Sequence, residues 1–237
     1  MVLLSATRYR LERVNRRDIR FFMEKWHYSG SINGLSCLYC FALYDDTTDE
    51  RFPELVGAAI FGRPAMKDQA PKWWPSNPTG VLELRRLACI DDTPKNTESF
   101  FIGQMLKWLT KHTEYEYILS LADPHYGHGG TIYQATNFER LGESSKVKVM
   151  MIGDKQWHPR SLALDKPFAR TLRRKIAVGH ETVRYEMRPA KVVYGYKLRR
   201  KRHRTHKVER VSSSNWSGWF HNDEDNPTHN DETTQTE

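Results

Sequence analysis

The chain has 237 residues, enough for one well-buried domain of about 150 to 200 residues plus extensions. Its formal net charge is +8. Residues 221–237 contain six acidic residues and no Lys or Arg, so residues 1–220 carry a surplus of 14 positive charges. This surplus favours nucleic acid over a membrane surface as the partner. No run approaches the ~20 apolar residues of a bilayer span, and no signal peptide is evident, so we expect a soluble intracellular protein without a membrane partner.

The first eighty residues predict strands and one helix around an irregular loop. Apolar patterning predicts strands near 7–13, 35–44 and 55–61 and a helix over 16–25. Residues 62–80 are rich in proline and predict a long loop, whose paired Trp73 and Trp74 are candidates for the wall of a pocket or for buried packing.

The middle of the chain predicts a strand, a loop, a helix and a second strand in that order. A strand is predicted over 81–90, a polar loop over 91–99, a helix over 100–111 and a second strand over 117–122. Asp123-Pro124 ends that strand, and a glycine-rich turn leads into a helix that carries Tyr133.

The remaining chain predicts a sheet edge and two tails. A strand over 146–152 is expected to pair with one near 192–198, which closes a catalytic domain over 1–198. Residues 199–220 form a basic and aromatic extension, and 221–237 are expected to be a disordered acidic tail. The order of elements predicts an α/β fold with a mixed central sheet flanked by helices.

The loop before the helix at 100–111 suits a phosphate group. A helix N-terminus leaves backbone N–H groups without partners and carries a partial positive charge. Asn96, Thr97 and Ser99 are candidate caps, with Lys95 beside them. An ordinary capped helix explains the same residues, and no P-loop or dinucleotide-binding glycine pattern is present.

Three further positions carry candidate chemistry, each with a structural alternative. His27 and Tyr28 follow a helix and precede Ser29-Gly30, so they could act as base and hydroxyl or only cap and pack. Asp123 lies at the carboxyl end of a strand, where ligand crevices form, although Asp-Pro also caps turns. Tyr133 could donate a proton to a leaving thiolate or belong to the core.

Metal and redox sites have weaker support. Cys37 and Cys40 form a lone CxxC in a predicted strand, where residues three apart point to opposite faces. His125 and His128 could bind iron with His27 or Asp123, and the metal ligands remain unknown.

Basic residues gather in three areas that could contact DNA phosphates or simply be solvated. The second area is Arg170, Arg173, Arg174 and Lys175. The predicted DNA-binding residues lie in the other two areas. The first area contains Arg16, Arg17 and Arg20, and the third contains Arg199, Arg200, Lys201, Arg202 and Arg204.

These motifs together resemble the phage Mom DNA-modification family, a divergent branch of the GNAT acetyltransferase superfamily, over roughly residues 8 to 155. The matching segments are Trp26–Gly30, Glu83–Leu87, Pro94–Ser99, Ala122–Pro124 and Gly130–Ala135. The resemblance implies a GNAT-like fold and a transferase that adds a carbamoylmethyl (acetamido) group to the exocyclic amine of adenine in phage DNA, protecting it from host restriction.

The resemblance also assigns roles to the residues above. It implies catalytic roles for His27, Tyr28, Asp123 and Tyr133, with acetyl-CoA as donor and double-stranded DNA as partner. It places the cofactor at six residues: Arg86, Ala88, Lys95, Asn96, Thr97 and Ser99. Arg86 is taken to face the crevice and its neighbour Arg85 to point away, because side chains alternate along a strand. An iron ion is a further implied cofactor.

The same resemblance implies the cytoplasm of an infected or lysogenic bacterial host as the location, and a homodimer stays open as an assembly. Two other functions remain open. One is an ordinary N-acetyltransferase of an amine or a protein, and the other is a catalytically inactive DNA-binding protein.

Overall fold

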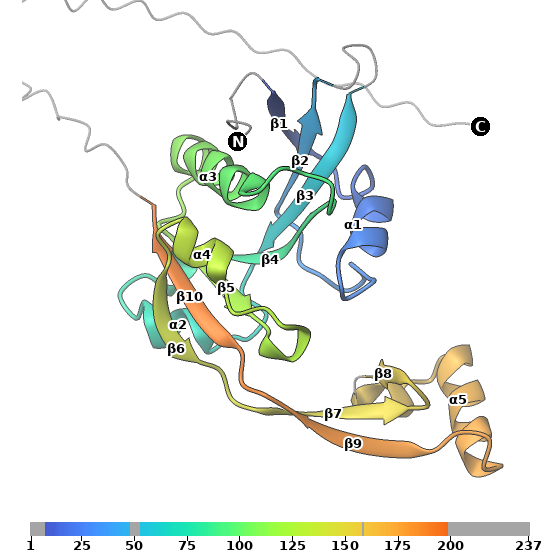
Figure 1. The fold of residues 1–237 in the computed structure, drawn as a ribbon. Coiled ribbons are helices and arrows are strands. Elements are labelled where there is room, and N and C mark those ends of the chain that lie inside the picture. Colours follow the sequence, from blue (N-terminus) through green and yellow to red (C-terminus); the bar gives the residue numbers. More distant parts are fainter. Residues whose placement is uncertain (1–7, 48–52, 158, 199–237) are drawn as a thin grey trace, which may run out of the picture. The chain divides into compact units, whose positions relative to one another are not determined.

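The computed structural model describes residues 8–47, 53–157 and 159–198, and its main element is a seven-stranded mixed sheet (Figure 1). The strands run in the order β1-β2-β3-β4-β5-β10-β6. Their bounds are β1 Tyr9–Val14, β2 Tyr39–Asp45, β3 Glu54–Gly62, β4 Val81–Cys89, β5 Tyr117–Ala122, β6 Glu139–Glu143 and β10 Val192–Lys197. The helices near this sheet are α1 Arg20–Trp26, α2 Gln69–Trp73, α3 Thr97–His112 and α4 Thr131–Ala135.

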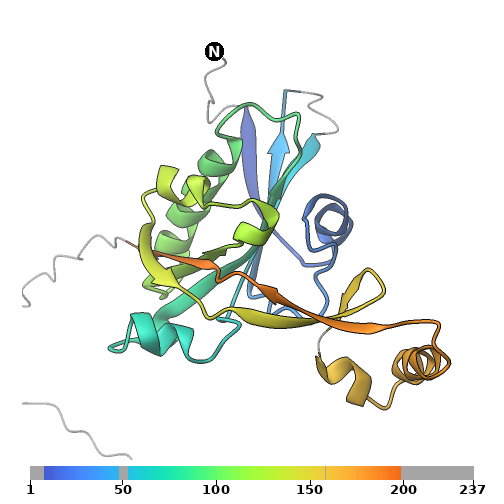
Figure 2. The same cartoon turned by 60° about the horizontal axis from the view of Figure 1, so that its bottom comes forward.

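Alternation along the central strands puts one hydrophobic cluster on each face of the sheet. Phe41 and Leu43 of β2 belong to the cluster with α3, whereas Cys40 and Ala42 belong to the cluster with Met23 of α1. Helices α3 and α1 therefore cover opposite faces, as Figure 2 shows. The predicted α/β fold, a mixed central sheet flanked by helices, is confirmed.

Most predicted elements are present with shifted ends. The strand predicted at 117–122 coincides with β5, and β1 to β4 lie within a few residues of their predicted positions. The proline-rich segment 62–80, predicted as loop, contains α2 and the 3-10 helix Pro78–Gly80. Trp73 and Trp74 pack near Val81 and Leu119.

Strands β4 and β5 form the parallel pair of the sheet and then separate. Their pairing runs from Val81–Tyr117 to Leu84–Ser120, after which β4 continues along β3 alone. The register between β3 and β4 also shifts, because Ile60 pairs with Arg86 while Phe61 pairs with Leu84. Arg85 is therefore the extra residue of a β-bulge, which interrupts side-chain alternation.

A second, three-stranded sheet of order β8-β7-β9 follows β6 in the chain. It comprises β7 Val147–Ile152, β8 Lys155–Trp157 and β9 Val183–Arg188, with the 3-10 helix Pro159–Ala163 and α5 Pro167–Ala177 between β8 and β9. The predicted pairing of 146–152 with 192–198 is wrong: β7 pairs with β8 and β9, and β10 pairs with β5 and β6.

Where the chain leaves the large sheet and where it returns, two hydrogen bonds tie the strand ends together. Ser144 N–H donates to the carbonyl of Lys191 at 2.9 Å, and Lys191 N–H donates to Ser144 Oγ at 2.9 Å.

Among the described residues, no helix is both long and apolar enough to cross a bilayer.

Candidate active site at the separation of β4 and β5

A cavity of about 390 Å³ opens where β4 and β5 part. Its walls come from β4 after the bulge, from the end of β5 with Asp123, from the glycine turn 127–130 and from the end of α1. Six of the predicted site residues line it: His27, Tyr28, Arg86, Ala88, Asp123 and Tyr133. Segments nearly a hundred residues apart thus deliver the four predicted catalytic side chains to one space.

His27 follows α1 as its C-cap and is 8% exposed. The backbone N–H of Ser29 donates to His27 Nδ1 at 3.1 Å, and Ser29 Oγ lies 2.9 Å from the same nitrogen. Burial, aided by the positive charges of Arg86 and Lys191, lowers the pKa of His27 to about 3. The ring is therefore neutral at neutral pH, and because Nδ1 accepts, the proton resides on Nε2.

Arg86 extends this arrangement from β4. Its Nε–H donates to Ser29 Oγ at 3.1 Å, and one terminal nitrogen donates to the carbonyl of Arg85 at 2.7 Å. Burial lowers the pKa of the Arg86 guanidinium from its ordinary value. Ser29 therefore links the cation of β4 to the imidazole that follows α1.

Arg85 also lines the cavity, which corrects the expectation that it points away from the crevice. The bulge is the physical reason, since strict alternation does not hold across an extra residue. Arg85 pairs with Glu83 at 3.2 Å and donates to the carbonyl of Arg63 at 3.0 Å. Arg86 is thus the arginine of the two that forms no ion pair with a carboxylate among the described residues.

Tyr28 forms a ledge of aromatic rings with Tyr126 and His128 beside the cavity. Its ring centroid lies 4.3 Å from that of Tyr126, 5.2 Å from that of His128 and 4.2 Å from that of His27. Tyr28 is 44% exposed, and burial of its remaining surface raises the pKa of the phenol. We call Tyr28, Tyr126 and His128 the aromatic ledge.

Asp123 is buried directly after β5 and both of its carboxylate oxygens have partners. Oδ1 accepts the backbone N–H of His125 at 3.1 Å, and Oδ2 lies 2.9 Å from Lys191 Nζ. Asp123 therefore caps the turn that follows it and also lines the cavity. Lys191, which directly precedes β10, is a site residue that the sequence patterns did not single out.

Tyr133 lies on α4 with its ring against Phe138 and Tyr194. Burial raises the pKa of its phenol to about 12, so the group keeps its proton at neutral pH. The neighbouring Tyr194 donates its hydroxyl hydrogen to the carbonyl of Gly129 at 2.9 Å. Gly130 has φ +85°, and a Cβ there would overlap the Tyr194 ring, so glycine is required at this close approach.

The four predicted cofactor residues around the start of α3, Lys95, Asn96, Thr97 and Ser99, do not line the cavity. Asn96 occupies the N-cap position with φ 73° and without a side-chain cap. Thr97 is fully buried and donates to the carbonyl of Pro94 at 2.7 Å, and Ser99 donates to the carbonyl of Asn96 at 3.0 Å. Lys95 is exposed. The part of this segment that reaches the cavity is acidic, with Asp91 and Glu98.

Trp73 and Trp74 are likewise absent from the lining of this cavity. Both pack near Val193, and Trp74 also lines a separate cavity with Tyr117. Other residues that line the cavity without a predicted role include Arg85, Cys89, Asp91 and Glu98.

The predicted DNA-binding residues fall into two sets. Arg16 donates to the carbonyl of Ile32 at 2.5 Å, Arg17 lies 3.5 Å from Asp18, and Arg20 pairs with Glu24 at 2.9 Å. Each N-terminal arginine thus already has a partner. The others, Arg199, Arg200, Lys201, Arg202 and Arg204, lie outside the described residues, as do the extension 199–220 and the tail 221–237.

An iron site does not fit the described side chains. Over residues 8–47, 53–157 and 159–198, no three His, Cys, Asp or Glu side chains come together as a metal-binding group. His125 instead contacts Arg188, and His27 Nδ1 is occupied by Ser29. Burial raises the pKa of Cys40 to about 12, which keeps this thiol of the CxxC protonated.

Comparison with known proteins identifies relatives of this chain. The family model described as "Mom protein family" matches residues 8–214. The methylcarbamoylase mom of Escherichia phage Mu is 34% identical over 76 residues, which are 32% of this chain and 32% of that protein. The match therefore spans about a third of the length of that curated relative.

Solved acetyltransferase structures are also similar at low identity. The ribosomal-protein-S5-alanine acetyltransferase from Vibrio fischeri aligns with a TM-score of 0.46 and 10% identity, over 84% of this chain and 97% of its own. Arabidopsis thaliana NAA60 in complex with acetyl-CoA aligns with a TM-score of 0.46 and 9% identity, over 80% and 98%.

Proposed function

The chain belongs to the Mom protein family, and from this membership we propose that it is a transferase that modifies DNA. The proposed reaction adds a carbamoylmethyl (acetamido) group to the exocyclic amine of adenine, protecting phage DNA from host restriction. The observation that supports it best is the convergence of His27, Tyr28, Asp123 and Tyr133 on one cavity. This proposal places the protein in the cytoplasm of a bacterial host.

Acetyl-CoA is the proposed source of the two carbons of the carbamoylmethyl group. The balance also takes an ammonia-level nitrogen, which replaces sulfur on the carbonyl carbon as CoA leaves as the thiol, and a two-electron oxidant for the bond between the methyl carbon and the adenine nitrogen. The separation of β4 from β5 supports this choice, because β4 beyond Leu84 has no strand partner on that side among the described strands. Its backbone N–H and C=O groups can bond a ligand that carries amides. Arg86 and Ala88 border this space, and Arg86 supplies a positive charge there.

Asp123 is the proposed proton acceptor. A nitrogen that forms a new bond to carbon must release a proton, and Asp123 is a buried carboxylate in the cavity wall. The ion pair with Lys191 and the bond from His125 fix its orientation before substrate binds.

His27 and Tyr133 are proposed as donors rather than bases. His27 is neutral with its proton on Nε2, so it can donate to an oxygen on which negative charge develops. Tyr133 keeps its proton and can give it to a sulfur leaving group placed between β4 and β5.

The aromatic ledge is proposed to hold the target base. An adenine amine inside a duplex is out of reach of a cavity, so the base must leave the helical stack. The Tyr28 and Tyr126 rings, 4.3 Å apart, offer a half-exposed surface on which a purine can stack.

Nucleoside mass spectrometry tests the proposal. Plasmid DNA from cells that express the protein should contain modified adenine and resist restriction, whereas DNA from cells with the Asp123→Asn variant should contain only ordinary adenine. Ordinary adenine in both samples would refute the proposal. Acetylation of a small amine without DNA would instead select the N-acetyltransferase alternative, and DNA binding without acetyl-CoA binding would select the inactive DNA-binding alternative.

A further inference from the structure

Residues 146–191 carry a positive surplus equal to the net charge of the whole chain. They hold twelve Lys and Arg against four Asp and Glu, a surplus of eight, while the other 191 residues hold 25 of each. This segment comprises β7, β8, α5 and β9 with their connections, and we call it the arm. A surplus of eight in 46 residues points to a polyanionic partner.

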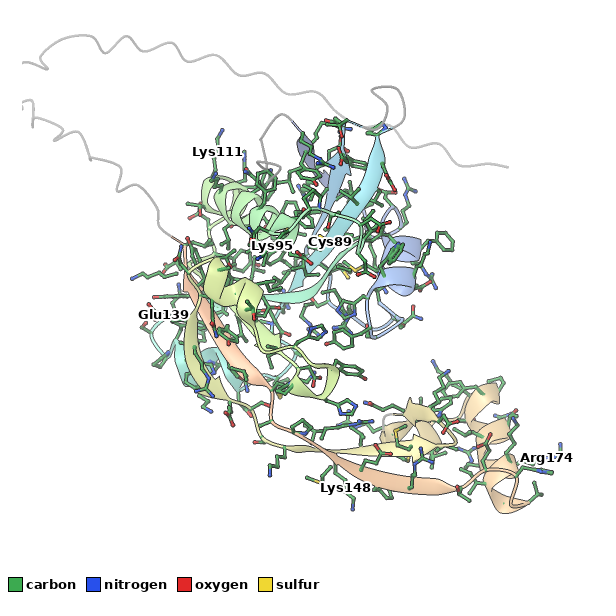
Figure 3. The ribbon with its side chains drawn as sticks, in the orientation of Figure 1. Cys89, Lys95, Lys111, Glu139, Lys148 and Arg174 are labelled. Atoms are coloured by element: carbon green, nitrogen blue, oxygen red, sulfur yellow. The ribbon has the colours of Figure 1, made fainter. Side chains whose placement is uncertain are left out.

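Helix α5 separates an apolar face from a basic one. Ala169 and Leu172 are buried and Ile176 packs against Met150 and its neighbours, so one side of the helix rests on the small sheet. At 100° per residue, Arg174 lies almost opposite Leu172. In Figure 3 the Arg174 side chain extends from α5 away from the strands.

Several cations of the arm have no acidic partner. Lys166, Arg174 and Lys175 are exposed, and within the described residues no ion pair to an acidic group involves them. Arg170 differs, because it pairs with Asp165 at 2.6 Å. Lys166 immediately precedes α5, and Arg174 and Lys175 lie in its last turn, so all three are available to contact an anion.

The strands of the arm expose an aromatic and an apolar side chain beside a lysine. Lys148 Nζ lies 4.6 Å from the centroid of the Tyr185 ring, Tyr185 is 54% exposed and Met187 is 62% exposed. Lys148 pairs with Met187 and Met150 with Tyr185 in the ladder, so these four lie on one face, beside α5. Cations interleaved with an exposed aromatic ring suit a nucleic-acid backbone with its sugars.

The end of the arm reaches the candidate active site. Arg188 of β9 contacts the His125 ring, and Lys191 pairs with Asp123. A duplex that lies along the arm would therefore pass close to the cavity.

We propose that the arm is the surface that binds the phosphate backbone of duplex DNA beside the target adenine. This inference rests on the proposed function for the identity of the polyanion, and it names the part of the chain that holds it. DNA is chosen over an anionic membrane because the end of the arm contacts the cavity in which the proposed function places a DNA base. The arm also exposes apolar side chains, among them Leu164, Phe168 and Val178, so the test includes lipid vesicles.

The test compares two full-length triple variants that each remove three exposed cations. The arm variant is Lys166→Gln, Arg174→Gln and Lys175→Gln, and the matched control is Lys67→Gln, Lys107→Gln and Lys111→Gln, whose lysines are exposed outside the arm. Anisotropy of a labelled duplex is measured over a range of salt concentrations, with circular dichroism as a check on folding.

The arm variant should bind more weakly, and its logarithmic salt slope should fall by about 2.7, which is about 0.9 for each lost phosphate contact. The control should keep the slope of the parent protein. Equal slopes in the two variants would overturn the inference. So would arm-dependent sedimentation with phosphatidylserine vesicles alongside arm-independent DNA binding.

Adenine modification by the unaltered protein is scored separately, so that the two proposals can fail independently. Arm-dependent DNA binding without modified adenine would refute the proposed function and leave the arm as a DNA-binding surface. Modified adenine together with arm-independent DNA binding would refute the role of the arm alone.

Discussion

Lys191 Nζ lies 2.9 Å from Asp123 Oδ2, and this ion pair joins the end of the arm to the cavity wall. We expect Asp123→Asn to abolish adenine modification, because the amide cannot accept the proton that the amine releases. Lys191→Met should reduce the rate less, since it frees the carboxylate without removing it. Nucleoside mass spectrometry gives the modified fraction.

DNA affinity separates this chemical role from a binding role. Asp123→Asn should bind duplex DNA at least as well as the parent protein, because removing a carboxylate removes no phosphate contact. The control for the lost charge in Lys191→Met is Lys111→Met, which likewise removes one positive charge, from an exposed lysine on α3. A large loss of DNA affinity in Asp123→Asn would contradict the assignment.

The depressed pKa of His27 predicts a particular loss of stability in acid. The ordinary pKa of histidine is near 6.5 and that of folded His27 is about 3, so the unfolded chain takes up this proton first as pH falls. The contribution of neutral His27 to the free energy of unfolding is therefore complete above about pH 6.5. It declines as pH falls towards 3, by at most about 1.4 kcal/mol per pH unit.

Urea unfolding from pH 7 to pH 4 checks this expectation. The free energy of unfolding of His27→Gln should depend less on pH than that of the parent protein, because glutamine does not titrate. His180→Gln, which replaces an exposed histidine, should follow the parent curve. Parallel curves for the parent and His27→Gln would show that His27 titrates normally in the fold.

Gly130→Ala should destabilise the turn before α4 by about 1 to 3 kcal/mol, because φ is +85° and the new Cβ would overlap the Tyr194 ring. Thermal unfolding measures the effect. Gly129→Ala is the matched control, since its φ is not in the left-handed region and a Cβ added there would have no other atom within 4 Å. Equal melting temperatures for the two variants would argue against the strained turn.

Tyr133→Phe removes one buried hydroxyl and leaves the ring in place. If Tyr133 gives a proton to the leaving group, the variant should lose roughly 100-fold or more in modification rate. Tyr194→Phe removes the neighbouring hydroxyl, which holds the carbonyl of Gly129, and should affect stability more than rate. A Tyr133→Phe variant with the parent rate would leave this tyrosine a packing residue.

Local patterns predicted those parts of the fold that depend on nearby residues. The apolar run 117–122 with Asp123-Pro124 after it defines β5 because strand and stop signal are adjacent. Three of the four predicted catalytic residues, His27, Tyr28 and Asp123, directly follow α1 or β5, whose ends the sequence marks with Ser29-Gly30 and Pro124. Tyr133 lies on α4, directly after the glycine turn.

Other parts depend on pairing over long distances, which no local pattern specifies. The apolar pattern of 147–152 does not specify its partner strand, and the observed partner β9 begins more than thirty residues later in the chain, after α5. The bulge that brings Arg85 into the cavity depends on β3, and the ion pair of Asp123 depends on Lys191, 68 residues further along. Thr97 was a reasonable phosphate ligand by sequence, yet its hydroxyl turns inward to Pro94.

The hydrogen bonds between Ser144 and Lys191 also bear on how this protein could have been assembled. Because β6 and β10 are antiparallel neighbours and Glu143 pairs with Val192, the two chain ends of the arm leave the large sheet side by side. Topologically the arm is an insertion into a β-hairpin, and a two-residue turn could replace it without changing the order of the seven strands. A transferase core could therefore exchange the outer part of the arm, and with it the surface offered to a polymer, provided that the end with Arg188 and Lys191, which contacts His125 and Asp123, was kept.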